Sequence, residues 1–427
     1  MTGKRRAGRP ASQPAPGPGP GPIVGRAPTR RELRAERRRL RRRRLGAGGI
    51  AGVVVVVLAL LAGGGFFVHQ ATSGPKKAGD PQQTMLIALI GADRSAAASM
   101  LAAHQAAPRA GFEMLLPSRL LTEVCGFSSQ QFGRVFAFPD GAKLARTTLS
   151  QVLGDVTIDR TLTLTSTQLS RLVDAVGGVV VDVDTDVITT SGASRVVAIP
   201  KGNGQRLNGA NAVLFATYVA AGEPPAASLT RFQSVFEAFI TGLPKKSSAV
   251  VGVLRSAQVD AASATAAASL FVELAADDRG NQFLSEIIPS QPIDSGGGAP
   301  AYRVEPTGLK SLVESQLGKS LPADDVSKWP TVLIQNGVGK SGLVQSACDR
   351  LLPAGFAFAG SGNASSFGHA KTQIFVFPPT PDDLVRVTKI GDQVADLLHV
   401  PRSDVLASTQ GNNVADVLVI LGADYKP

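Results

Sequence analysis

One glycine pattern in the sequence is associated with binding nucleotide phosphates. Gly337, Gly339 and Gly342 form a G-x-G-x-x-G motif between a predicted strand and a predicted helix, and such turns hold a pyrophosphate at the start of the helix. A dinucleotide site also needs an acidic residue after the next strand, but that strand ends at Ala359-Gly360-Ser361. The surrounding module is too short for two nucleotide-binding halves. We therefore interpret the glycines as a tight strand-to-helix turn.

Two other patterns could hold metals. Asp182, Asp184 and Asp186 have the spacing that opens a calcium loop, but Val187 stands where that loop requires glycine and Ala193 where it requires glutamate. The alternation of these aspartates with valines instead predicts the solvated face of a strand. The four histidines show no metal-ligand spacing, and neither G-x-S-x-G nor H-E-x-x-H occurs. They lie at His69, His104, His369 and His399.

The positive charge of the chain is confined to its first residues. The 427 residues carry 44 Lys and Arg, 33 Asp and Glu, and a net charge of +11. Residues 1–45 hold 15 of the bases and 2 of the acids, which leaves 29 bases against 31 acids in the other 382 residues. A nucleic-acid-binding domain carries its basic surface on a folded face. We therefore expect no nucleic-acid partner.

The N-terminal region predicts a single membrane anchor. The arginine cluster Arg37–Arg44 is followed directly by Leu45–Val68, which contains no charged residue. About 20 apolar residues span a bilayer as a helix, and basic residues stay on the cytoplasmic side. We therefore expect a disordered cytoplasmic tail at 1–45, a transmembrane helix at 46–68 and a linker at 69–83. A cleaved signal peptide is the alternative, although its basic region would be unusually long.

This orientation places the remainder of the chain outside the cytoplasm, in a single-pass membrane protein. Cys125 and Cys348 then lie in an oxidising compartment, where disulfides persist. They are 223 positions apart. The sequence leaves open whether they pair or form two separate buried thiols.

Helical and strand patterns interleave after residue 83, which predicts an α/β fold. We expect one domain at 84–322 and a smaller one at 329–427, with a turn-rich break at 290–300 near the end of the first. In the first domain, strands are predicted at 85–90, 111–116 and 179–187, and helices at 167–176, 208–219 and 229–243. In the second, strands are predicted at 331–335, 356–359, 372–377 and 416–421, and helices at 343–352 and 382–398.

Several stretches in this order resemble the LytR–CpsA–Psr family of cell-envelope proteins. Gly91-Ala92-Asp93-Arg94 is similar to the loop after the family's first strand, Gly-Ser-Asp-x-Arg. The segment 172–179 matches the family's "LVDALGGV" almost residue for residue, and 205–212 resembles the start of its "LNGEQAL" helix. The stretches 332–337 and 416–425 resemble the LytR C-terminal domain. The order and spacing of these stretches together carry the resemblance.

The resemblance implies a site for a lipid-linked diphosphate. Members of the family transfer glycan polymers from a polyprenyl-pyrophosphate carrier to peptidoglycan, with arginines on the pyrophosphate and aspartates on a magnesium ion. Carried over to this sequence, Arg94, Arg119 and Arg231 are the candidates for binding pyrophosphate, and Asp93 is the candidate metal ligand. Bidentate arginines suit a diphosphate, and magnesium prefers carboxylate oxygens.

The sequence departs from the family at several of these positions. The second aspartate of the first loop falls on Ala97 or Ala98, and the family's Pro-Arg-Asp appears as Pro117-Ser118-Arg119. An arginine pair after the "LNGEQAL" helix falls on Thr217 and Val219. The resemblance therefore assigns no catalytic residue with its complete set of partners.

Two functions follow as hypotheses. The first is a membrane-anchored protein of cell-wall assembly, in which a degenerate family domain binds lipid-linked glycan, peptidoglycan or partner proteins. The alternative is an active, magnesium-dependent phosphotransferase that attaches glycan polymers from polyprenyl pyrophosphate to peptidoglycan. The missing arginines favour the first.

Overall fold

The computed structural model describes residues 82–191, 194–294, 299–408 and 414–427. The predicted tail at 1–45, the transmembrane helix at 46–68 and most of the linker at 69–83 lie outside these ranges. Within them, every helix is too short or too polar to cross a bilayer.

A five-stranded sheet of order β11-β3-β2-β1-β6 forms the centre of the first domain. β2 is antiparallel to both β1 and β3, whereas β6 is parallel to β1 and β11 to β3. Four strands therefore point the same way. The strands are β1 (Gln83–Ile90), β2 (Ala96–Gln105), β3 (Ala110–Leu116), β6 (Arg160–Thr165) and β11 (Phe283–Ile287).

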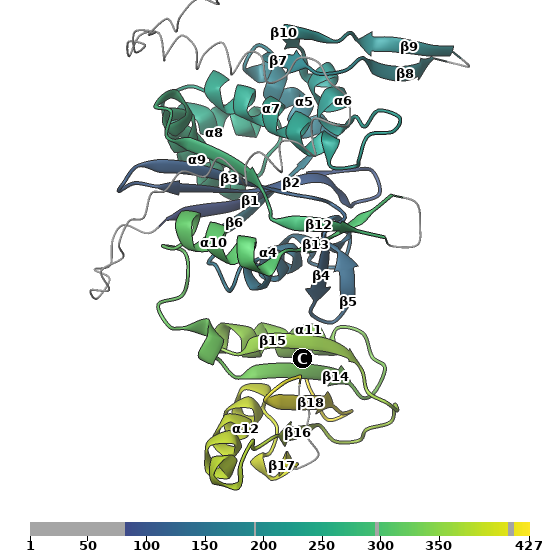
Figure 1. The fold of residues 1–427 in the computed structure, drawn as a ribbon, viewed down its shortest axis with the longest axis vertical. Coiled ribbons are helices and arrows are strands. Elements are labelled where there is room, and N and C mark those ends of the chain that lie inside the picture. The colour runs from purple at the N-terminus through teal and green to yellow at the C-terminus, as the bar shows by residue number, and fades with distance from the viewer. Residues whose placement is uncertain (1–81, 192–193, 295–298, 409–413) are drawn as a thin grey trace, which may run out of the picture. The chain divides into compact units, whose positions relative to one another are not determined.

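Helices cover both faces of this sheet (Figure 1). The helices of one face are α5 (Ser166–Ala175), α6 (Gly209–Thr217), α7 (Ala227–Gly242), α8 (Ser247–Ser256) and α9 (Ala261–Arg279). Those of the other face are α3 (Phe132–Val135), α4 (Gly141–Val152) and α10 (Pro306–Gln316). Alternate residues of β1 enter the two cores, with Ile87 and Leu89 on the first face and Leu86 and Ala88 on the second. Because both faces are covered, β1 is a continuous apolar run.

Four two-stranded hairpins or ribbons surround the first sheet. They pair β4 (Leu121–Val124) with β5 (Ser128–Gln131), β7 (Val179–Val183) with β10 (Gly202–Leu207), β8 (Val187–Ser191) with β9 (Ser194–Ile199), and β12 (Ser290–Ile293) with β13 (Ala301–Val304). Two predictions need correction here. The strand predicted at 179–187 is two strands separated at Asp184–Asp186, and the predicted break at 290–300 begins with the strand β12.

The second domain is a separate five-stranded sheet of order β15-β14-β18-β16-β17. Its elements are β14 (Thr331–Asn336), α11 (Leu343–Leu351), β15 (Ala357–Asn363), β16 (Gln373–Val376), α12 (Leu384–Leu398), β17 (Val405–Ala407) and β18 (Val417–Leu421). Short 3-10 turns lie at Val326–Lys328, Leu352–Ala354, Pro381–Asp383 and Arg402–Asp404. All six elements predicted for this region are confirmed, and the three-residue β17 is the addition.

A disulfide between Cys125 and Cys348 joins the two domains. Cys125 follows β4 at the turn of the first domain's β4–β5 hairpin, and Cys348 lies in α11 of the second. Their Cα atoms are 6.6 Å apart. Both residues are buried in the core of the second domain. Cys125 and Cys348 thus pair, which the sequence had left open.

Candidate functional site

The candidate site lies at one edge of the first sheet. Because β1, β3 and β6 are parallel, their carboxyl ends meet at that edge, which is where open α/β sheets bind ligands. The loop after β1 carries Asp93 and Arg94, and the loop after β3 carries Arg119. The hydroxyl of Ser118 donates to the carbonyl oxygen of Ala97 at 2.8 Å, which joins the second loop to the start of β2, directly after the first loop. We call this region the β1/β3 edge.

Asp93 and Arg94 form a tight turn on that edge. The amide of Arg94 donates to the carbonyl of Gly91, and the amide of Gly91 donates to the carbonyl of Ser95. Oδ1 of Asp93 accepts the amide of Ser95 at 3.1 Å. Arg94 has a left-handed φ of 67°, which is unfavourable for a residue other than glycine. The turn leaves the side chains of Asp93 and Arg94 exposed to solvent.

Arg119 is held by the neighbouring β12–β13 hairpin. Its Nε donates to the carbonyl of Pro300 at 2.9 Å, and Nη2 donates to the carbonyl of Ala299 at 2.6 Å. The carbonyl of Arg119 in turn accepts the amide of Tyr302. These partners are neutral, so they orient the guanidinium without compensating its charge. The β1/β3 edge thus carries two arginines and one aspartate.

Arg231 of α7 is in a different environment. Its side chain is 2% exposed and makes five hydrogen bonds at 2.7–2.9 Å. Two go to the carboxylate of Asp184, two to that of Glu223 and one to the carbonyl of Tyr218. Burial lowers the pKa of the guanidinium, but the bonds to Asp184 and Glu223 outweigh burial and raise the pKa above its ordinary value. We call these four residues the Arg231 cluster.

The Arg231 cluster is poorly suited to a diphosphate as it stands. A guanidinium has five N–H donors, and all five of those of Arg231 are engaged. One arginine beside two carboxylates leaves a local charge of −1, which repels an anion. Among the described residues, no hydrogen bond or ion pair joins Arg231 to the β1/β3 edge. Pyrophosphate binding by Arg231 therefore requires the displacement of Asp184 and Glu223.

The residues at the edge do not form a complete metal site. Asp93 is the one carboxylate in the two loops, which are residues 91–95 and 117–120. In the described part of the chain, no three His, Cys, Asp or Glu side chains gather where they could hold a metal ion. Asp93 alone offers one ligand group where dedicated sites use several.

The three aspartates that resemble a calcium loop are engaged with protein groups. Asp184 belongs to the Arg231 cluster, whereas Oδ1 of Asp182 accepts the amide of Gly204 and Oδ1 of Asp186 accepts the amide of Lys201, each at 2.7 Å. The prediction of a strand face was therefore wrong for Asp186 and Asp184, because both lie between β7 and β8. Of the two, the 39% exposed side chain of Asp184 also binds a distant arginine. No sequence signal identified its partner, because Arg231 lies 47 positions away.

The glycine motif of the second domain is a tight turn, as predicted. Gly339 and Gly342 have φ values of 72° and 82°, which favour glycine. Oδ1 of Asn336 accepts the amides of Val338 and Gly339 at 3.2 and 2.9 Å. These amides are therefore already bonded within the turn.

A charged cluster that the sequence did not predict lies at the opposite end of β2 and β3, where these strands meet α9. Nδ1 of His104, near the end of β2, lies 2.7 Å from Oδ2 of Asp277 in α9. Nε of Arg109 lies 2.7 Å from the other oxygen of Asp277, and its Nη2 is 2.7 Å from Glu273. Burial raises the pKa of Asp277, and the bond to His104 partly opposes that rise. The cluster ties the β2–β3 turn to α9.

Sequence comparison identifies two families along the chain. The model of the LytR_cpsA_psr family matches residues 76–241, and that of the LytR cell envelope-related transcriptional attenuator matches residues 330–425. Together the two matches span more than half of the chain. No curated protein sequence matches it.

Several solved structures are similar to part of the chain. A transcriptional regulator from Enterococcus faecalis is 17% identical with a TM-score of 0.45, over 57% of this chain and 91% of that one. TagV from B. subtilis is 15% identical with a TM-score of 0.47, over 57% and 98%. A LytR-Csp2A-Psr enzyme from Actinomyces oris is 16% identical with a TM-score of 0.42, over 55% and 89%. On these matches, the chain carries a LytR–CpsA–Psr family domain at residues 76–241, followed by a LytR C-terminal domain at residues 330–425.

Proposed function

We propose that this protein is a membrane-anchored, extracytoplasmic component of cell-wall assembly that binds a lipid-linked glycan at the β1/β3 edge without transferring it. The family match supports a role in the cell envelope. One observation favours binding over transfer. All five N–H donors of Arg231 already bond to protein acceptors, so none is free for a diphosphate.

The β1/β3 edge supplies the attraction for the anionic end of such a carrier. Arg94 is exposed in the turn after β1, and Arg119 is oriented by two neutral carbonyls. A phosphate oxygen accepts charge-assisted bonds from such guanidinium groups. Each bond of this kind contributes about 1.5–3 kcal/mol, which corresponds to about tenfold or more in affinity.

Binding is tested with a polyprenyl diphosphate of 20 carbons and the purified full-length chain in detergent. Titration calorimetry should give a saturable affinity that falls about tenfold in Arg94→Ala and in Arg119→Ala. Arg206→Ala is the matched control, because Arg206 also donates to a backbone carbonyl, that of Gly177. Equal affinity in all four proteins would contradict binding at the β1/β3 edge.

Transfer is tested separately, so that the two hypotheses can be told apart. The full-length chain is incubated with magnesium, a labelled lipid-linked glycan and peptidoglycan, and the label on peptidoglycan is counted. We expect no transfer above background. Transfer that is lost in Asp93→Asn would establish the alternative, a phosphotransferase with Asp93 on its metal ion.

A further inference from the structure

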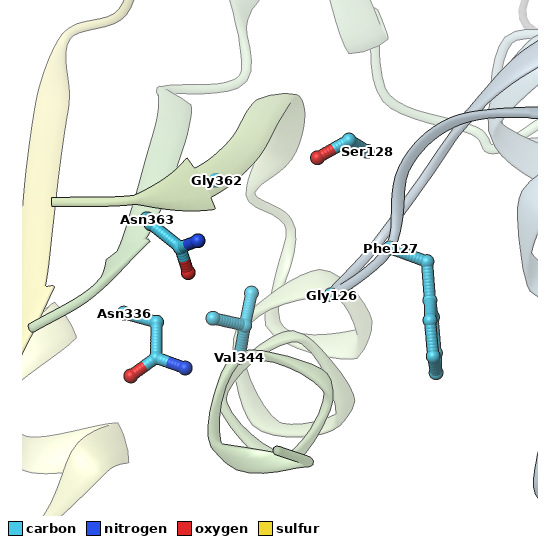
Figure 2. A pocket seen from close by; sticks show the side chains of 7 residues that line it. All are labelled: Gly126, Phe127, Ser128, Asn336, Val344, Gly362 and Asn363. Atoms are coloured by element: carbon cyan, nitrogen blue, oxygen red, sulfur yellow. The ribbon is translucent and has the colours of Figure 1, made fainter. Parts of the chain in front are cut away.

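A pocket lies where two parallel strands of the second domain end. β14 and β15 finish side by side, with Asn336 opposite Asn363, and the helix α11 starts beyond them. The pocket has a volume of about 220 Å³. On this side its walls are Asn336, Val344, Gly362 and Asn363 (Figure 2). The region outside the carboxyl ends of parallel strands is the usual ligand crevice of an α/β sheet.

The first domain supplies the other wall. Gly126, Phe127 and Ser128, in the turn of the β4–β5 hairpin, complete the lining. The disulfide at Cys125 fixes this turn, and the amide of Gly126 donates to Oγ of Ser361 at 3.0 Å. Gly126 has a φ of 83°, and a Cβ at this position would lie 3.3 Å from the backbone nitrogen of Gln345. We call the enclosed space the junction pocket.

The chemistry of the junction pocket is polar and uncharged. None of its lining side chains is acidic or basic. The side chain of Asn336 is already engaged, since Nδ2 donates to the carbonyl of Lys340 and Oδ1 accepts two amides. The amide of Asn363, by contrast, is exposed and points into the space between Asn336 and Gly362 in Figure 2. It offers both a donor and an acceptor.

These features select the kind of ligand. A lining without cations does not favour a phosphate or carboxylate, and one without anions does not favour an amine. Mixed amide, hydroxyl and backbone groups match a neutral molecule that both donates and accepts hydrogen bonds. The volume is below the 300–1,000 Å³ that encloses a drug-sized ligand, so it holds one ring. We propose that the junction pocket binds a single ring of a neutral saccharide that bears hydroxyl and acetamide groups.

The proposal is tested by hydrogen–deuterium exchange of the full-length chain in detergent. The probes are the β-1,4-linked trimer of N-acetylglucosamine, the glucose trimer maltotriose, and inorganic phosphate. Saccharide should protect the peptides that contain 126–128 and 360–364. Protection by the N-acetylglucosamine trimer supports the proposal, whereas protection by maltotriose alone contradicts recognition of the acetamide group. Protection by phosphate alone, or by none of the three, overturns it.

Two variants locate the binding. Asn363→Ala removes the exposed amide and should weaken saccharide binding about tenfold. Gly362→Leu should abolish saccharide binding, because Gly362 lines the pocket and a leucine side chain there would occupy it. The fold should tolerate the substitution, since no heavy atom lies within 4 Å of a Cβ built at this position. Asn203→Ala, at an exposed position of β10, is the control and should bind as the natural chain does. Unchanged binding in both pocket variants would also overturn the proposal.

Discussion

Arg231 donates all five of its N–H groups to protein acceptors, so its main effect is expected on stability. Replacing it with methionine leaves the carboxylates of Asp184 and Glu223 side by side without a cation. Such a loss typically costs 3–5 kcal/mol at a buried site, and we expect about 3 kcal/mol because Asp184 is 39% exposed and regains water. Urea unfolding of the variant and the natural chain measures the difference.

The geometry of the Arg231 cluster supplies the control. Arg231→Lys keeps the charge but cannot donate in the fork that serves two carboxylates and a carbonyl. It should therefore recover only a minor part of the lost stability. A lysine variant as stable as the natural chain would show that charge alone, and not the five-bond arrangement, matters at this position.

Glu113 is the second residue whose environment predicts a measurable effect. It lies in the middle of β3 with no solvent exposure, and among the described residues neither of its carboxyl oxygens has a hydrogen-bond partner. Burial, together with the negative charges of Glu237 and Asp278, raises its pKa well above the ordinary 4.5. Above pH 4.5 the folded chain thus holds a proton that the unfolded chain releases, so this group lowers stability as the pH rises towards its raised pKa.

The prediction is that Glu113→Met stabilises the chain at pH 7, by about 1–3 kcal/mol, and reduces the fall in stability as the pH rises above 4.5. Urea unfolding at several pH values checks both parts. Glu286→Met, at an exposed position of the adjacent strand β11, should change stability by no more than about 0.5 kcal/mol. A Glu113→Met variant with the pH profile of the natural chain would contradict the prediction.

At the scale of elements, the β4–β5 hairpin links the two domains. Its turn carries Cys125 into the core of the second domain. At its base, the amide of Phe132 donates to the carbonyl of Leu120, and the amide of Gly133 donates to that of Ser118. The hairpin therefore connects the disulfide with the loop that holds Arg119.

We predict that the double variant Cys125→Ser, Cys348→Ser loses about 2–5 kcal/mol of stability, the usual effect of removing a native disulfide. Hydrogen exchange should accelerate in the hairpin and in α11, while β1 and β6 keep their protection because the hydrogen bonds of the first sheet hold them. Mapping of unreduced peptides provides the first check. Recovery of both cysteines as free thiols from the oxidised, full-length chain would refute the pairing.

The elements also show what the sequence could predict. β1 and β14 were found because their apolar runs are bounded by turns, whereas β2 was missed because its alanine-rich sequence, AAASMLAAHQ, lacks the branched residues that favour strands. The alanine-rich helix α9 was missed for a similar reason, since its helical face has little contrast. The loops with Asp93 and Arg119 followed from the family resemblance. The Arg231 cluster did not, because no local pattern indicates which distant charges meet.

At the scale of the whole molecule, two independent features bear on location. The charge asymmetry of the first 45 residues, followed by an uncharged stretch at 45–68, predicts a cytoplasmic N-terminus. The disulfide between Cys125 and Cys348 requires an oxidising environment for its formation. Both features support an extracytoplasmic position for the two domains, and they depend on different residues.

The corresponding prediction concerns fusions at the carboxyl end of the full-length chain. A reporter enzyme that needs disulfides to fold should be active in intact cells, whereas a fluorescent protein that folds only in the cytoplasm should stay dark. Replacing the arginines of 37–44 with glutamine should weaken this preference, because the positive charges keep the N-terminus inside. Cytoplasmic fluorescence together with reduced Cys125 and Cys348 would contradict the orientation. It would also remove the lipid-linked glycan from reach of the β1/β3 edge, so this result tests the proposed function as well.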